Sequence, residues 1–172
     1  DWVLEHCTGE IETTVAFSPE AQQYWSGVLA TFTVTNTNDS GLGSLRQAIT
    51  DANALGGADT IAFAIGSGAQ TISPTSALPE IEDQLTIDGW TQPGFAGLPL
   101  IRIDGASAGA VVDGLSMCAA GSGSVIRGLM LTRFTQDGIF IDAGADNITV
   151  AGNWLGTDGS GLTTMGNGND GI

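Results

Sequence analysis

The stretch from Gly43 to Ala54, GSLRQAITDANA, carries the strongest local folding signal in the chain. Ser44 stands at the N-cap position of a helix, and Gln47 follows three residues later, as in a capping box. Four apolar residues then recur at helical spacing, namely Leu45, Ala48, Ile49 and Ala52. The sequence therefore predicts a helix over residues 44–54 with one apolar face turned to a core.

On both sides of this helix the chain consists of short apolar runs separated by Gly, Asp, Asn, Ser or Pro. Before it, IETTVAF (11–17) and VLATFTVTNT (28–37) alternate apolar and polar residues. After it come further runs, from TIAFAI (60–65) to NITVAGNWLG (147–156). Short runs bounded by turn residues are typical of strands, so the sequence predicts an all-β fold around a single helix.

A degenerate repeat organises these strands. Asp-Gly before an apolar residue occurs at Asp113, Asp137 and Asp170, with spacings of 24 and 33 residues. A second column is expected through Gly105, Gly128 and Gly152, while the column of Asp88-Gly89 stays open. Such a period is typical of coils that stack on one another and share a core, which is a parallel β-helix.

Two consequences follow for this expected stack. The 44–54 helix is interpreted as a cap, because the first coil of a stack would otherwise expose core and strand edges to water. The nine extra residues TDGSGLTTM (157–165) are expected to form a surface loop.

Composition limits the function. The 172 residues carry a net charge of −15, with four arginines as the only strongly basic residues. No basic stripe is present to replace counterions, so nucleic acid and anionic membranes are poor partners. No run of 18 apolar residues predicts a membrane span. The glycine count of 26 suits a β-rich protein with many tight turns.

The first 30 residues differ from the remainder and are assigned as an N-terminal extension, a possible donor or interaction strand; residues 31–172 form the expected repeat domain. The two cysteines, Cys7 and Cys118, are a candidate disulfide in an oxidising compartment, and two buried free thiols are the alternative.

The segments FTVTNTNDSGLGSLRQAITDANALGGADTIAFAI (32–65) and LPEIEDQLTIDGWTQPG (78–94) closely resemble the start of bacterial secreted and surface proteins with right-handed parallel β-helix repeats. Many of these carry Cys before Ser-Leu-Arg-Glu-Ala, where this chain has Gly43 and, for the Glu, Gln47. The resemblance covers residues 31–172. It implies an all-β, right-handed parallel β-helix and an extracellular or cell-surface location, without specifying a function.

Polysaccharide lyase or glycoside hydrolase activity is an alternative hypothesis, because many parallel β-helices act on polysaccharides. The resemblance implies an Arg or Lys base beside calcium-binding Asp for a lyase, or clustered Asp for a hydrolase. The candidates here are Arg102 and Arg127, expected near one column, with Asp88 and Asp104 close in sequence. The alternative is that both arginines simply point outward from strands.

Other candidate sites are weaker. GNGNDGI (166–172) fits part of a calcium-binding repeat through Asp170, although a turn is the simpler interpretation. Trp90 and Trp154 could stack on sugars or belong to core and cap. Two triplets match the N-glycosylation acceptor pattern, at Asn38 and Asn147.

The function expected from the sequence is a non-catalytic, extracellular structural module, adhesive or filament-forming, with no cofactor. Its expected partners are other copies, joined head to tail, or an extracellular polysaccharide. A lyase or hydrolase is the first alternative, and a carbohydrate-binding module is the second. The stop at NGNDGI, inside a repeat, is read either as the cut edge of a longer protein or as an end that a partner covers.

Overall fold

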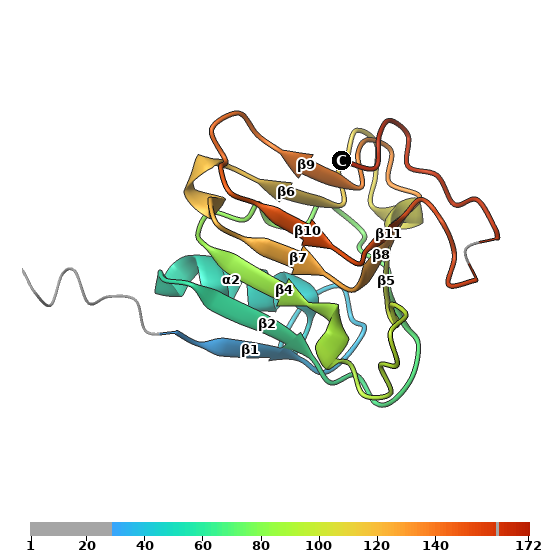
Figure 1. Cartoon of the computed structure of the whole chain (residues 1–172), viewed down its shortest axis with the longest axis horizontal. Coiled ribbons are helices and arrows are strands. Elements are labelled where there is room, and N and C mark those ends of the chain that lie inside the picture. The colour runs from blue at the N-terminus through green and yellow to red at the C-terminus, as the bar shows by residue number, and fades with distance from the viewer. Residues whose placement is uncertain (1–28, 161) are drawn as a thin grey trace, which may run out of the picture.

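The computed structural model describes residues 29–160 and 162–172 (Figure 1). Three parallel sheets and one helix enclose a single apolar core. Sheet A has the strand order β1-β2-β4-β7-β10, sheet B the order β11-β8-β5-β3, and sheet C pairs β6 with β9. From β4 to β11 the chain visits sheets A, B and C in turn, so that neighbouring strands in a sheet are far apart in sequence.

The elements are short throughout. The helix is α2 (Leu45–Leu55), and three 3₁₀ turns follow individual strands: η1 (Gly89–Thr91), η2 (Gly105–Ser107) and η3 (Ala119–Gly121). The strands are β1 (Thr31–Val34), β2 (Asp59–Phe63), β3 (Gln70–Ile72), β4 (Leu85–Asp88), β5 (Ile101–Asp104), β6 (Leu115–Met117), β7 (Val125–Arg127), β8 (Leu129–Thr132), β9 (Ile139–Ile141), β10 (Thr149–Ala151) and β11 (Trp154–Leu155).

The expectation of an all-β right-handed parallel β-helix is wrong. The described chain has a mixed architecture, in which separate parallel sheets of five, four and two strands pack with an α-helix, and they do not close into a solenoid. Sheet C is short because the segment that leads to it contains Pro74 and Pro79, which cannot donate to a ladder. That segment contributes only Ile81, as an isolated bridge to Met117.

The helix itself forms as the sequence predicts. Ser44 is its N-cap, and the Ser44 hydroxyl oxygen accepts a hydrogen bond from the Gln47 backbone N–H at 3.2 Å. The capping box is incomplete, because the Gln47 side chain donates to Asp51 instead of reaching back to Ser44. The predicted apolar face is buried and joins the core: Leu45, Ala48, Ile49 and Ala52.

The backbone hydrogen bonds confirm the prediction that the three Asp-Gly repeats lie next to one another. The Gly114 N–H donates to the Asp137 carbonyl at 2.9 Å, and the Gly138 N–H donates to the Asp170 carbonyl at 3.0 Å. Side chains add a second ladder, in which Asp113 Oδ1 accepts from the Asp137 N–H and Asp137 Oδ1 accepts from the Asp170 N–H. Equivalent dipeptides therefore lie on adjacent strand connections.

The expected glycine column needs correction. Asp88 pairs with Arg127, and Arg127 pairs with Ala151, so the aligned glycines are Gly89, Gly128 and Gly152. Gly105 follows β5, which pairs with β8 in sheet B, so Gly105 is not aligned with these three glycines.

Alternation in sheet A separates a core face from an outer face. The inward row is fully buried at Ile61, Ile87 and Ile126. The outer rows are set by the same register, and one of them runs through Thr31, Thr60, Thr86, Val125 and Thr149.

Candidate functional site

The outer face of sheet A carries an ion pair between adjacent strands. Arg127 Nη2 on β7 lies 2.6 Å from Asp88 Oδ2 on β4. Asp88 Oδ1 also accepts from the Trp90 backbone N–H at 3.1 Å, which caps η1. The Arg127 guanidinium lies over the Trp90 ring, 4.6 Å from its centroid, in a cation–π contact.

Trp90 lies across the aligned glycines. A Cβ atom added at Gly128 would lie 2.7 Å from Trp90 Nε1, and one added at Gly152 would lie 3.3 Å from Trp90 Cζ2. The indole thus crosses two later strand connections while 38% of Trp90 stays exposed. Phe95 is its aromatic neighbour, with a centroid distance of 6.0 Å. Trp90 therefore packs across two of the connections between sheets A and B, at Gly128 and Gly152.

Sheet B carries a second group of charges. Arg133 forms an ion pair with the buried Asp104 through both Nε and Nη2. Arg102 Nε lies 4.0 Å from Asp104 Oδ2, at the limit of an ion pair. Asp104 Oδ1 also accepts from the Ala106 N–H and so caps η2.

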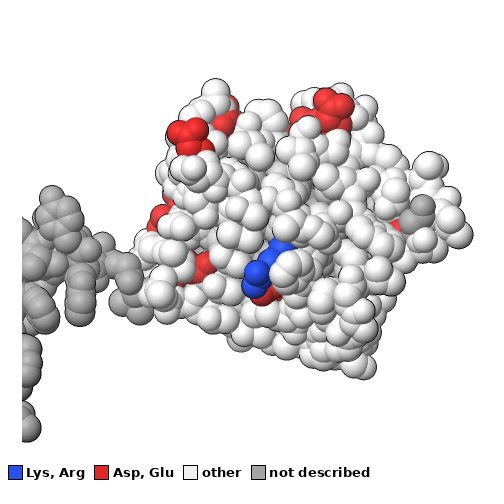
Figure 2. Space-filling model, in the orientation of Figure 1, with Lys and Arg blue, Asp and Glu red and all other residues white. Residues whose placement is uncertain are grey.

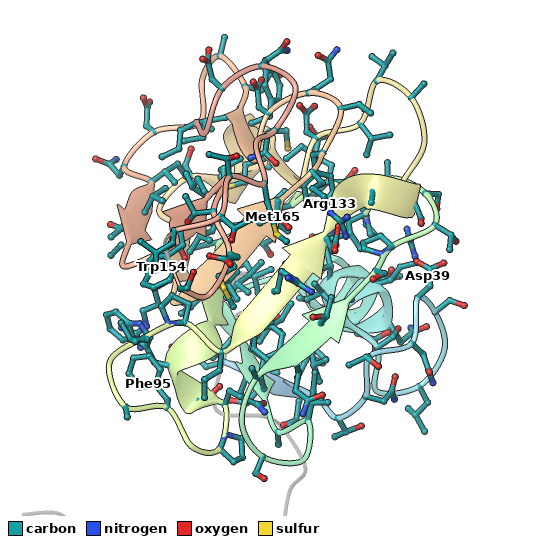
Figure 3. The ribbon with its side chains drawn as sticks, turned by 90° about the vertical axis from the view of Figure 1, so that its right-hand side faces the viewer. Asp39, Phe95, Arg133, Trp154 and Met165 are labelled. Carbon is teal, nitrogen blue, oxygen red and sulfur yellow. The ribbon has the colours of Figure 1, made fainter. Side chains whose placement is uncertain are left out.

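Met165, at the end of the segment that follows β11, packs beside this second group. Thr157 and Thr164 form an antiparallel bridge, and Arg102 Nη1 donates to Met165 Sδ at 3.7 Å. The Arg133 N–H donates to the Met165 carbonyl, and Figure 3 shows Arg133 and Met165 close together on this side. Met130 on the outer face of β8 is only 4% exposed. The described residues of this segment, 157–160 and 162–165, are mostly exposed, as expected for a surface loop, and Met165 also covers part of sheet B beside Arg102.

The candidate catalytic residues do not come together as one set. Arg102 lies on β5 in sheet B, opposite Met130, whereas Arg127 lies on β7 in sheet A, opposite Asp88. The expectation that both arginines lie near one column is wrong, because β5 pairs with β8 and not with β7. Each candidate carboxylate instead belongs to its own ion-paired group.

Hydrogen bonds in both groups favour the charged forms of Arg127, Arg133 and Asp104. The hydrogen bond to Asp88 raises the pKa of Arg127, and the hydrogen bond to Asp104 raises the pKa of Arg133. Burial alone would raise the pKa of Asp104, yet the Arg133 and Ala106 hydrogen bonds bring it below its usual value. A general base needs a neutral arginine and a general acid needs a protonated carboxyl, so these shifts oppose a base role for Arg127 and an acid role for Asp104.

A third ion-paired group was not predicted from the sequence. Asp39, in the connection before α2, accepts from Arg46 Nη2 at 2.8 Å and from the Thr75 hydroxyl at 2.7 Å. Arg46 also donates to the carbonyls of Ser76 and Ala77. These bonds lower the pKa of Asp39 to about 2, chiefly through Arg46 and then Thr75. Asp39 and Arg46 lie seven residues apart, but their other partners, Thr75, Ser76 and Ala77, lie 30 or more residues further along the chain, where the sequence gives no local signal for the contact.

The remaining candidates are dispersed. Asp170 donates its N–H to Asp137, and its side chain is exposed. In residues 29–160 and 162–172, no group of three or more His, Cys, Asp or Glu side chains is placed to hold a metal ion. Trp154 is half-buried on β11, on the strand that pairs with β8. Asn38 and Asn147 are both exposed, and Asn147 adopts a positive φ of 59°.

Two predictions fall wholly or partly outside the described residues. Cys118 is half-buried and its Sγ lies 3.6 Å from the Ile81 carbonyl oxygen. Its candidate disulfide partner Cys7 lies outside the described residues, as do residues 1–28 of the N-terminal extension.

Comparison of the chain with models of protein families, with curated proteins and with solved structures finds no match. In the part of the chain that the structure describes, no helix has both the length and the apolar character needed to cross a membrane.

Proposed function

We propose that this chain is a non-catalytic structural module of a secreted or cell-surface bacterial protein and that it adheres to a neutral polysaccharide through the outer face of sheet A. One observation carries the non-catalytic part. Of the residues best suited to lyase or hydrolase chemistry, Arg127 pairs with Asp88 between strands β7 and β4, and Asp104 pairs with Arg133. Arg102 lies 4.0 Å from Asp104 on the same strand, β5. The Arg127–Asp88 and Arg133–Asp104 pairs join segments that are distant in the chain.

The character of the outer face supports adhesion to a neutral surface. One row across its five strands is formed by threonines and one valine, without a formal charge. Figure 2 shows this side of the molecule with one basic group beside an acidic one near its middle, and with further acidic groups toward its margins. A chain of net charge −15 is repelled by acidic polymers, which favours a neutral partner.

Two features support the location. The chain is free of lysine and strongly acidic, and residues 31–172 resemble segments of bacterial secreted and surface proteins. Both are features of the sequence, and a cell-fractionation experiment with an antibody against this chain tests the location directly.

The catalytic alternative is tested with the full chain and a panel of acidic and neutral polysaccharides. Unsaturated products and new reducing ends are measured over time. The proposal predicts neither product above the background of a heat-denatured sample. Cleavage by the wild-type chain that disappears in a folded Arg127→Gln variant would establish a lyase or hydrolase.

Adhesion is tested by co-sedimentation with insoluble cellulose and chitin as neutral probes. The double substitution Thr60→Glu and Thr86→Glu places two charges on the outer row and should abolish binding. The matched control, the double variant Ala106→Glu/Ser107→Glu, adds the same two charges on the exposed turn η2, away from sheet A, and should bind as wild type. Retention of binding by the double variant would contradict this role of sheet A. Light scattering of the same samples would detect head-to-tail assembly.

A further inference from the structure

Strand β1 presents an open edge at the outside of sheet A. The carbonyls of Ala30 and Val34 accept hydrogen bonds from Thr60 and Ala64, on the side of β2. Because backbone groups alternate along a strand, the N–H and C=O groups of Thr31 and Thr33 point away from β2. Further along this edge, the Thr35 N–H donates to the Gly43 carbonyl at 2.9 Å. Within the described residues, this edge of β1 is therefore hydrogen-bonded at Thr35, while the outward backbone groups of Thr31 and Thr33 have no strand beside them.

A hollow of about 210 Å³ adjoins this edge. It lies between β1 and the first turns of α2, and its walls include Thr33, Gln47 and Ala48. Leu42 stands at its border and is 93% exposed. An open strand edge beside a hollow with an apolar border is the arrangement that accepts an added strand, whose alternate side chains fill the hollow.

The chain carries a segment with the matching pattern immediately upstream. Residues 11–17, IETTVAF, lie outside the described residues and alternate Ile11, Thr13, Val15 and Phe17 with more polar or smaller residues. Thirteen residues separate this segment from β1, which is enough for a crossover between parallel strands. The Ala30 N–H donates to Asp59 Oδ1 at 2.8 Å, so the tether is fixed at the start of β1.

We propose that residues 11–17 of this chain add as a further strand to the edge of β1 in the same molecule, with Val15 and Phe17 toward the hollow. A short tether gives an effective concentration of about millimolar, which favours the chain's own segment over that of another copy. Exchange between two copies would use the same edge and segment reciprocally and would close as a dimer. Docking in the same molecule covers an edge that would otherwise template association.

Amide hydrogen exchange in the full-length chain tests this proposal. The Thr31 and Thr33 amides should exchange at least about tenfold more slowly than in a Val15→Asp variant, because the charge cannot enter the hollow. The matched control Ala16→Asp places the same charge on the opposite face of the segment and should keep the protection. The Thr60 amide, which bonds to Ala30, reports that the fold is intact in every variant.

Three results would overturn the proposal. The first is unprotected Thr31 and Thr33 amides in the wild-type chain. The second is equal protection in wild type and in a folded Val15→Asp variant. The third is protection that appears only with a dimer at high concentration, since it would assign the edge to a second copy.

Discussion

The indole of Trp90 lies against Gly128, so a residue without a side chain on one strand connection accommodates an aromatic residue from an earlier one. Gly128 also has a φ of 70°, in the left-handed region that favours glycine. Two independent requirements therefore meet at this position.

Substitution of Gly128 by Ala should lower the free energy of unfolding by about 2–4 kcal/mol, because it adds a clash with Trp90 to backbone strain. Gly68→Ala is the matched control. Gly68 has a similar φ of 77° but open space around it, so it should lose only about 1 kcal/mol. Urea denaturation measures both, and the double variant Gly128→Ala/Trp90→Ala should show a less than additive loss. Equal losses at Gly128 and Gly68 would contradict the clash.

Truncation of the buried face of α2 should be costly. Leu45 is fully buried, so Leu45→Ala should lower the free energy of unfolding by about 2–5 kcal/mol through lost burial and a cavity. Leu55 on the same helix is 42% exposed, and Leu55→Ala should lose less than about 1 kcal/mol. A small loss at both positions in equilibrium denaturation would mean that the helix adds little to the core.

The incomplete capping box predicts unequal effects at its two ends. Ser44→Ala removes the acceptor for the Gln47 N–H and the donor to the Gly41 carbonyl, and should destabilise the chain by about 1–2 kcal/mol. Gln47→Ala removes only the side-chain contact with Asp51 and should cost less than about 0.5 kcal/mol. Thermal and urea denaturation measure both losses of stability. Equal losses for Ser44→Ala and Gln47→Ala would indicate a complete, reciprocal capping box instead.

Stability should depend on pH through Asp39. Its folded pKa of about 2 lies below the ordinary 3.8, so the unfolded chain takes up a proton first as the pH falls. The stabilising contribution is fully present above the ordinary value and is lost as the pH falls toward 2. Asp39→Asn should therefore unfold more easily than wild type at neutral pH, and the difference should shrink in acid. Glu82→Gln, at an exposed carboxyl, is the control, and a pH-independent difference for Asp39→Asn would refute the assignment.

Local patterns accounted for the parts of this protein that depend on near neighbours. The 3.6-residue spacing of Leu45, Ala48 and Ile49 predicted the helix, and Ser44 predicted where it begins. The Asp-Gly repeats at Asp113 and Asp137 predicted adjacent strand connections. In each case the residues concerned either lie within about one turn of helix or share the same short pattern, Asp-Gly before an apolar residue, at equivalent positions.

Predictions from the sequence were wrong where the number of residues between paired strands varies. Thr86 pairs with Val125, 39 positions later, whereas Val125 pairs with Thr149 after only 24. A repeat of constant length therefore placed Gly105 and Arg102 in the wrong column. Long loops are tolerated because the entropy of closing a loop grows only slowly with its length.

By itself, then, the sequence determined the helix and its cap, the short strands and the neighbourhood of the Asp-Gly repeats, since these follow from local backbone preferences and side-chain periodicity. The tertiary structure decided that three separate parallel sheets pack with the helix, and that Asp88 pairs with Arg127 while Asp104 pairs with Arg133. These partners are set by strand register across the core, and register depends on how all the apolar faces and intervening loops pack together.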